Sequence, residues 1–424
     1  MTIFDLVFCD YYGYPPQIKG QLRRILEVLS SASSTSSILL LGSAARGELS
    51  YAYFHDRLEV FSDYEFLVIT DGPVSVREKG RQTQMLVELE EKFFPHNPLF
   101  HIDVIYREKG RLSTLQPIIF TYELKQNAQA LYGSDVKASI PDVSLRNLDL
   151  KNANEILYKR LWAMLLHIPR NLVKGAMSDF EEMVLRYVLW RNPLDLTTVL
   201  LPHEGVLLPT YEERVAYVAK NYRGLRFSRA LGPEFPSFLA ECLAGRKELK
   251  SIRPSLELYS QALHYLEKGL AYIVGDFAQS VDLPVQVAQR SRRIFNEGPI
   301  SRGELASLAR LGWRLVGRRG LKQTWRWLRM PKKGLLTAGF LHMHRALLDY
   351  LKGKIEAAGE HLDGAEVCLN ELALKTAGAV PPQPFPGRWL ALRRLWGEFW
   401  AEYIRLGDPR YKSRFQFIME WRDE

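Results

Sequence analysis

Strand-like sequence is confined to the first third of this chain, and this confinement limits the folds open to it. Apolar runs of strand length, bounded by turn residues, occupy residues 38–41, 66–69 and 99–106. Helical spacing of apolar residues fills residues 17–29 and 118–131, and residues 74–94 are polar and helix-forming. The alternation of the two patterns predicts a compact α/β unit that ends near residue 142.

Beyond about residue 145 the strand pattern almost disappears. Helical spacing recurs over residues 154–166, 179–190, 211–221, 256–273, 335–351, 355–374 and 389–404. A chain of 424 residues is long enough for two or three domains. We predict an α+β fold class: a mixed sheet with flanking helices over 1–142, then helical regions over 143–290 and 291–424.

Composition narrows the class of protein. A content of 47% hydrophobic and 25% charged residues is that of an ordinary globular protein. Cys9, Cys242 and Cys368 are scattered, which excludes a disulfide framework or a structural zinc site built on paired cysteines. No uncharged apolar run has the length of a membrane-spanning helix, and the N-terminus carries acids in place of a basic leader. We expect a reduced, cytoplasmic protein without an integral membrane segment.

The net charge of +9 belongs to one segment, residues 301–333, which contains ten basic residues and one acid. Arg310, Arg314, Arg318 and Lys322 repeat every four residues and would form a stripe on a helix. Such a stripe can bind nucleic-acid phosphates or lie peripherally on an anionic membrane surface. A solvated face balanced by acids on other helices is an equal alternative.

A Gly-Ser pair follows the first predicted strand. Gly42 allows close approach of the backbone to a ligand, and Ser43 adds a hydroxyl donor. Arg46 lies three residues beyond and can give charge-assisted hydrogen bonds to phosphate oxygens. We expect these three residues to hold phosphate groups.

Three acids accompany the next two predicted strands. Asp63 and Glu65 are two residues apart, so both side chains point to one face of a strand. Asp103 lies between Ile102 and Val104, where a carboxylate is costly unless it is paired or bound to a metal. Neighbouring carboxylates repel each other unless a cation lies between them, and Mg²⁺ or Mn²⁺ suits oxygen ligands.

This ordered set resembles the DNA-polymerase-β-like nucleotidyltransferase superfamily, over about residues 15–140. The strings Gly-Ser-Ala-Ala-Arg-Gly-Glu from Gly42 and Ala-Leu-Tyr-Gly from Ala130 are similar to its minimal and antibiotic-modifying branches. The resemblance implies that Asp63 and Glu65 bind two metal ions, and that Asp103 joins one metal and helps to deprotonate the attacking hydroxyl. Two features depart from the pattern: Glu65 replaces the commoner aspartate, and 19 residues separate Ser43 from Asp63. We expect residues 49–61 to form an inserted loop beside the site.

The leading hypothesis is a Mg-dependent enzyme that transfers an NMP from an NTP, with ATP favoured, to a hydroxyl acceptor. The helical region would select that acceptor, whose identity the sequence does not name. The alternative is a weak or inactive relative that acts as a nucleotide sensor or as a polyanion- or membrane-binding scaffold.

Overall fold

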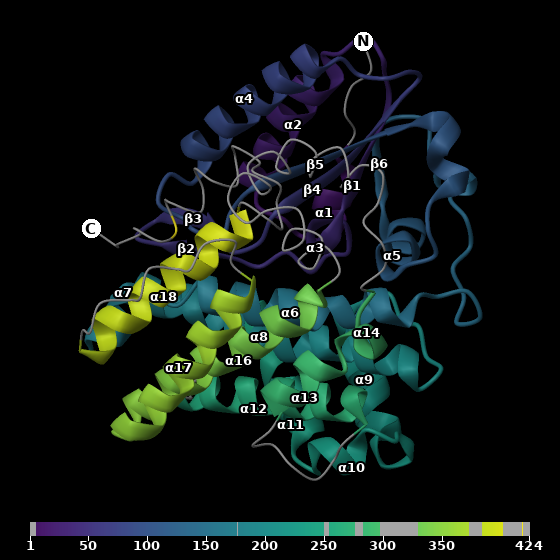
Figure 1. Cartoon of the computed structure of the whole chain (residues 1–424). Helices are drawn as coiled ribbons and strands as arrows, with labels where there is room; N and C mark the ends of the chain where they lie inside the picture. The colour runs from purple at the N-terminus through teal and green to yellow at the C-terminus, as the bar shows by residue number, and fades with distance from the viewer. Residues whose placement is uncertain are drawn as a thin grey trace, which may run out of the picture. The chain divides into compact units, whose positions relative to one another are not determined.

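Four strands form one mixed sheet in the N-terminal part of the computed structural model (Figure 1). Their order is β5-β4-β1-β6, with β4 and β5 parallel and the other pairs antiparallel. The bounds are β1 Thr35–Leu41, β4 Tyr64–Thr70, β5 Ile102–Glu108 and β6 Gln129–Gly133. The structure describes residues 6–175, 177–249, 254–275, 283–296, 330–372, 384–401 and 418.

The residues fall into two compact units, each described here by itself. The first consists of Met1–Leu150, Leu201–Val218 and Ala240–Ser251, and the second of Lys151–Leu200, Ala219–Leu239 and Ile252–Glu424. The predicted fold class is confirmed, because a mixed sheet with flanking helices is followed by a large helical region. The boundaries near residues 142 and 290 stay a prediction.

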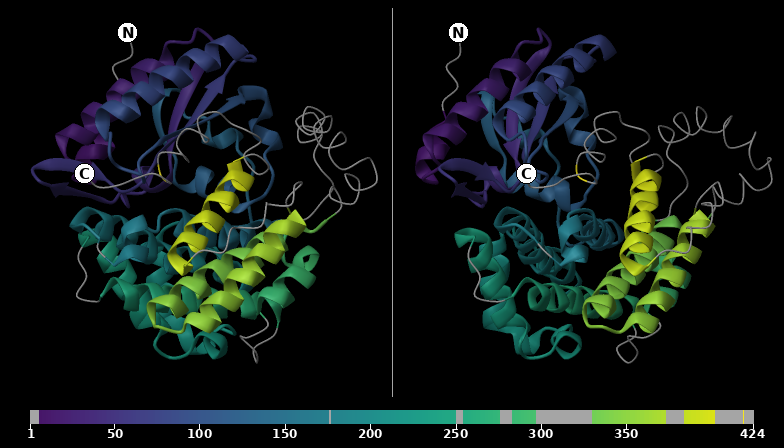
Figure 2. Two further views of the ribbon diagram at one scale, coloured as in Figure 1. Left: turned by 60° about the vertical axis from the view of Figure 1, so that its left-hand side comes forward. Right: turned by 90° about the vertical axis from the view of Figure 1, so that its left-hand side faces the viewer.

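Two helices cover one face of the sheet. Helices α2 (Pro16–Ser30) and α4 (Val76–Phe93) lie side by side, as the views of Figures 1 and 2 both show. Their apolar side chains pack with alternate strand residues, among them Ile38, Tyr64 and Phe66. Helix α2 matches the segment predicted from apolar spacing, and α4 matches the polar, helix-forming segment 74–94. The crossover through α4 is what allows β4 and β5 to run parallel.

The opposite face of the sheet carries the other set of alternating residues. Leu41, Leu67 and Ile69 pack there against Leu124 of α5 (Ile119–Asn127) and Leu112 of the 3₁₀ helix η1 (Lys109–Thr114). Side chains two residues apart along a strand point to the same face of the sheet. Asp63 and Glu65 lie four and two residues before Leu67, so their side chains point toward this second face. The candidate site therefore lies on the face that α2 and α4 leave uncovered.

Two predictions within this unit are wrong in part. Residues 129–131 belong to strand β6 and do not continue helix α5, because Leu39 and Leu40 of β1 pair with Ala130 and Gln129. The expected loop over residues 49–61 contains a hairpin of β2 (Tyr51–Phe54) and β3 (Arg57–Val60). Its two-residue turn has positive φ at His55 and Asp56, which suits the twist of a tight hairpin.

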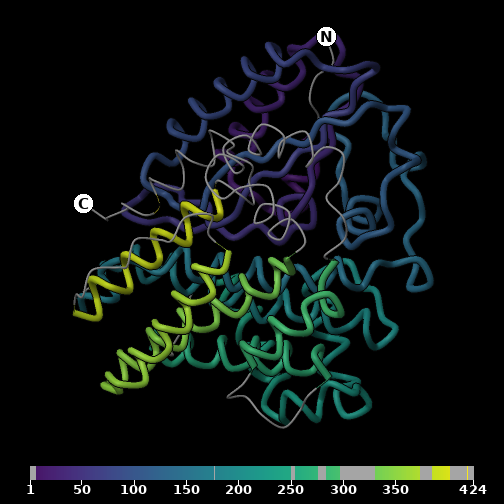
Figure 3. Tube along the Cα trace, viewed as in Figure 1, coloured from purple at the N-terminus to yellow at the C-terminus, as the bar shows by residue number. Residues whose placement is uncertain are grey.

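The described residues of the second unit form helices joined by turns and loops. The predicted helices recur as α6 (Leu150–Leu166), α8 (Asp179–His203), α9 (Tyr211–Asn221, up to Val218 in the first unit), α12 (Ser255–Val274), α16 (Lys332–Leu351), α17 (Ile355–Leu372) and α18 (Phe385–Phe399). Figure 3 follows them in chain order. Further helices of the second unit are α7 (Arg170–Lys174), α10 (Ser228–Leu231), α13 (Leu283–Gln289) and α14 (Ser291–Ile294). Helix α11 (Phe235–Glu248) is divided between the units, and α1 (Val7–Tyr11) belongs to the first.

Aromatic side chains form much of the interior of the second unit. Trp190, Trp389 and Trp396 are fully buried. Gly339 of α16 lets Trp396 of α18 approach closely, because a Cβ at position 339 would lie 2.3 Å from the indole ring. The tryptophans of these helices therefore belong to the core, as their helical spacing predicts.

Candidate metal and phosphate site

The parallel pairing of β4 with β5 brings the start of both strands together. Glu65 is the register partner of Asp103, and Tyr64 is the partner of Ile102. Asp63 comes directly before β4, and His101 comes directly before β5. Residues that enter neighbouring parallel strands meet at the same edge of a sheet. Two acids predicted from distant parts of the sequence thus become neighbours.

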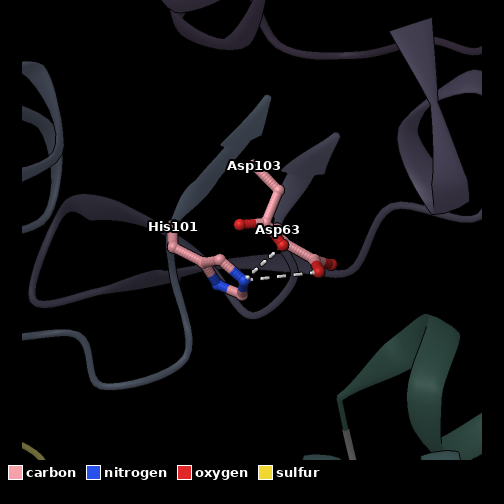
Figure 4. A group of neighbouring side chains, drawn as sticks. All are labelled: Asp63, His101 and Asp103. Carbon is pink, nitrogen blue, oxygen red and sulfur yellow. Dashed lines mark hydrogen bonds and ion pairs between the residues drawn. The ribbon is translucent and has the colours of Figure 1, made fainter. Parts of the chain in front are cut away.

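Asp63, His101 and Asp103 offer three ligand atoms that all lie within 4.8 Å of one another (Figure 4). His101 Nε2 lies 3.1 Å from Asp103 Oδ2 and 3.6 Å from Asp63 Oδ2. The exposed fraction of the side chain is 13% for Asp63, 29% for His101 and 50% for Asp103. The group therefore stands at the margin of solvent, where a hydrated ion can enter.

The orientation of the His101 ring follows from its second hydrogen bond. Nδ1 lies 3.3 Å from the carbonyl oxygen of Leu99. Because a carbonyl only accepts, Nδ1 carries a hydrogen in this contact, and the ring is turned so that Nε2 lies within hydrogen-bond distance of Asp103 Oδ2. The sequence reasoning missed His101. The signal available was its place two residues before Asp103, the spacing that puts two side chains on one face of a strand.

Glu65 points toward the Gly-Ser turn and is not a member of this group of three. Its carboxylate lies directly against Gly42, where a Cβ would come within 2.0 Å of Glu65 Oε2. Gly42 also has φ of +64°, a left-handed conformation that favours glycine. Position 42 thus requires glycine for two reasons: the backbone conformation is left-handed, and the Glu65 carboxylate leaves no space for a Cβ.

Ser43 is joined to the acidic group through a second hydroxyl. Ser43 Oγ lies 2.8 Å from Ser62 Oγ, and Ser62 Oγ donates to Asp63 Oδ1 at 3.2 Å. Since Ser62 has a single hydroxyl hydrogen, Ser43 is the donor in the first of these bonds. The short helix α3 (Gly42–Ala45) is therefore connected to Asp63 although 19 residues separate them. Ser62 was not predicted as a site residue.

Arg46 follows this turn and lies in a buried ion pair. Its Nε donates to Glu48 Oε2 at 2.8 Å, and its Nη1 lies 3.3 Å from Glu123 Oε2. Burial lowers the pKa of Arg46, but the carboxylates of Glu123 and Glu48 outweigh burial and hold it above its ordinary value. The guanidinium predicted to bind phosphate is thus engaged with two acids of the protein.

The same acids connect the turn to helix α9, within the first unit. Glu48 Oε1 accepts from the backbone N–H of Tyr211 at 2.6 Å, and Arg214 Nη2 donates to Glu123 Oε1 at 2.6 Å. The guanidinium carbons of Arg46, Arg214 and Arg246 lie 5.6, 5.7 and 5.0 Å from the centre of the Tyr211 ring. We call Arg46, Glu48, Glu123 and Arg214 the buried ion network. These contacts hold the residues that directly follow the Gly-Ser turn against helix α9.

The β2–β3 hairpin replaces the predicted loop between Ser43 and Asp63. Asn97 ties its second strand to the segment before β5, because its side-chain amide donates to Glu59 Oε2 and to the carbonyl of Val60, both at 3.0 Å. Ser50, at the hairpin's start, donates to the carbonyl of Arg246 at 3.0 Å. The insertion is therefore an ordered element attached at both ends.

The donor set fits a divalent cation. Two ligands that each bind a small divalent ion at about 2.1 Å, at right angles, lie about 3 Å apart. The separations of 3.1 and 3.6 Å around His101 Nε2 are close to this distance. Carboxylates close together are also stabilised when a cation lies between them. Asp63 and Asp103, two of the predicted metal ligands, thus lie together with His101 in a group that could hold a metal ion, and the metal site stays a prediction.

The basic segment 301–333 lies outside the described residues except for its end. There, Lys333 pairs with Glu155 of α6, with 2.5 Å between Nζ and Oε1. Within the described ranges, no helix combines the length and apolar character needed to cross a membrane.

Comparison with known proteins provides no basis for assigning this chain to a family. No family model matches the chain, and no curated protein matches it. Among solved structures, the chain is similar to spectinomycin adenyltransferase AAD(9) from Enterococcus faecialis, determined with ATP and spectinomycin. The two are 12% identical with a TM-score of 0.35, over 60% of this chain and 98% of that chain. A similarity this weak establishes neither a fold nor a function.

Proposed function

We propose that this protein is a metal-dependent nucleotidyltransferase, which transfers an NMP from an NTP to a hydroxyl acceptor. The observation that carries the proposal is that Asp63 and Asp103 lie together at the start of two parallel strands. Asp63 is also connected through the Ser62 hydroxyl to Ser43 of the Gly-Ser turn. Metal-ligating acids and a phosphate-binding turn in one place are what this reaction requires.

In this proposal Asp63 and Asp103 hold Mg²⁺ or Mn²⁺. Glu65, the register partner of Asp103, joins them by turning its carboxylate away from Gly42. The metal, when bound, neutralises charge on the phosphates and favours the ionised form of the acceptor hydroxyl. Asp103 is the most exposed acid of the group, and its carboxylate takes the proton of the acceptor hydroxyl. The acceptor oxygen then forms a bond to the α-phosphorus, and the bond from that phosphorus to the bridging oxygen breaks. Pyrophosphate leaves with the electron pair.

The Gly-Ser turn holds the leaving phosphates. Backbone N–H groups of Gly42 and Ser43 are its donors, and the Ser43 hydroxyl joins them when it turns away from Ser62 Oγ. Arg46 would contact a phosphate only if that phosphate replaced Glu123 as a partner, since both carboxylates of the buried ion network now occupy its guanidinium. ATP is the first nucleotide to test, because the sequence resemblance favours it.

The test is transfer of label from α-³²P NTPs, with Mg²⁺ or Mn²⁺, to acceptors in a fractionated cell lysate. Asp63→Asn should reduce labelling at least about hundredfold, since even residues that support a metal ligand are worth 10–100-fold. Asp71→Asn is the matched control, because Asp71 is an exposed acid just beyond the other end of β4. Equal labelling by wild type and Asp63→Asn would disprove the proposal. Nucleotide binding that needs no metal and yields no pyrophosphate would favour the sensor alternative.

A further inference from the structure

His101 brings a nitrogen to a site that is otherwise built from carboxylates. Its Nε2 faces Asp63 Oδ2 and Asp103 Oδ2 at 3.6 and 3.1 Å. Both distances suit ligands of one ion, as the separation of about 3 Å between neighbouring ligands shows. In Figure 4 the ring nitrogen faces an oxygen of each acid, so an ion held by both carboxylates also lies near it.

The other ring nitrogen provides independent support. A histidine that binds a metal commonly donates its second N–H to a backbone carbonyl or a carboxylate, which fixes the ring and its tautomer. In His101 this partner is the carbonyl of Leu99, 3.3 Å from Nδ1. The Leu99 carbonyl thus holds the ring in the orientation that directs Nε2 at the two carboxylates.

We propose that His101 Nε2 is a metal ligand together with Asp63 and Asp103, and that it makes the site select Mn²⁺ over Mg²⁺. This deepens the proposed function, because the selected ion is the one that the transfer reaction uses. Mg²⁺ strongly favours oxygen ligands and keeps several waters. Imidazole nitrogen suits transition metals, and the affinity of a mixed nitrogen and oxygen site rises from Mn²⁺ toward later metals of the series.

The alternative role for His101 is a charged partner that neutralises the two acids without any metal. In that arrangement Nε2 carries a hydrogen, and a bound ion would displace the ring instead of coordinating it. The two roles differ in whether a nitrogen nucleus is coupled to the bound metal.

The experiment uses the purified full chain without nucleotide. Pulsed electron paramagnetic resonance of bound Mn²⁺ should show coupling to one ¹⁴N nucleus in the wild type. Calorimetric titration of Mn²⁺ should show a loss of affinity of at least about tenfold in His101→Asn. The Mg²⁺ affinity of that variant should change far less. His55→Asn is the matched control, because His55 is exposed at the hairpin turn and its positive φ also suits asparagine.

Absence of nitrogen coupling in the wild type would overturn the proposal, and this measurement does not depend on the folding of any variant. An unchanged Mn²⁺ affinity in His101→Asn would also overturn it. The outcomes separate the two proposals. Nitrogen-coupled Mn²⁺ without nucleotide transfer to any fraction supports the role of His101 and contradicts the transferase. Transfer with no nitrogen coupling supports the transferase and contradicts the role of His101.

Discussion

Two charged clusters of the first unit differ in burial and in charge balance. The acidic group of Asp63, His101 and Asp103 reaches solvent, with half of the Asp103 side chain exposed. The buried ion network contains two arginines and two glutamates, and the exposed fractions of Arg46, Glu48, Glu123 and Arg214 are 8, 4, 24 and 4%.

The difference follows from the cost of desolvating charge. Equal numbers of opposite charges with good hydrogen bonds can be buried, whereas an excess of one sign needs water or a counter-ion. The buried ion network is therefore suited to position the Gly-Ser turn. The acidic group is suited to bind a cation. Converting a carboxylate to an amide should have different effects in the two clusters.

The largest expected effect is in the buried ion network. Glu48→Gln leaves Arg46 buried with Glu123 as its only remaining carboxylate, although the amide oxygen can still accept from Tyr211. Removing one partner of a buried pair costs about 3–5 kcal/mol, so the free energy of unfolding should fall by this amount. Urea denaturation measures it. Glu88→Gln, on the exposed side of α4, is the control and should change stability little. A loss below 1 kcal/mol for Glu48→Gln would remove the contrast between the clusters.

Metal binding at Asp63, His101 and Asp103 should stabilise the folded protein. At a Mn²⁺ concentration 100 times the dissociation constant, the free energy of unfolding should rise by about 2.7 kcal/mol. Thermal unfolding with and without Mn²⁺ measures this increase. It should vanish in Asp63→Asn and persist in Asp71→Asn. An equal increase in all three proteins would place the binding ion elsewhere.

Gly42→Ala tests the contact between the turn and Glu65. The left-handed φ of +64° and the 2.0 Å approach of Glu65 Oε2 both oppose a Cβ at this position. Strain of this kind costs about 1–3 kcal/mol, and the displaced Glu65 should also weaken metal binding. Gly20→Ala is the control, because Gly20 lies inside helix α2 with no atom within 4 Å of its added Cβ. That change should stabilise the protein by about 0.5–1 kcal/mol. A change in the free energy of unfolding with the same sign in both variants would contradict the steric argument.

The smallest expected effect on stability is that of Asp103→Asn. This change removes one acid from a cluster with excess negative charge, so it relieves repulsion while it removes the contact with His101. Exposed charge interactions contribute about 0–1 kcal/mol, and the free energy of unfolding in metal-free buffer should change by no more than that. Denaturation in the presence of a chelator measures the change. A loss as large as that of Glu48→Gln would show that the acidic group is structural.

Periodicity in the sequence predicted most helices and three of the sheet strands, because burial of one face imposes a local pattern. Strand β6 was missed because residues 129–131 continue the apolar spacing of α5, and only their pairing with β1 makes them a strand. The sequence predicts a loop where the β2–β3 hairpin lies, because the residues of the hairpin are largely half-buried or exposed and show no apolar face. The helix predicted to end at residue 190 continues past Pro193 to His203, where burial of its apolar residues outweighs the proline.

The sequence by itself determined the chemistry available at the site, since Asp63, Glu65, Asp103 and the Gly-Ser pair are all evident in it. Only the tertiary structure decided how they group. The parallel register of β4 and β5 joins Asp63 to Asp103 and adds His101, while Glu65 turns to Gly42. Arg46 likewise meets Glu123, 77 residues away, in the buried ion network. Spacing along a chain predicts which face a side chain occupies, but contacts between distant segments depend on strand register and on burial of charge.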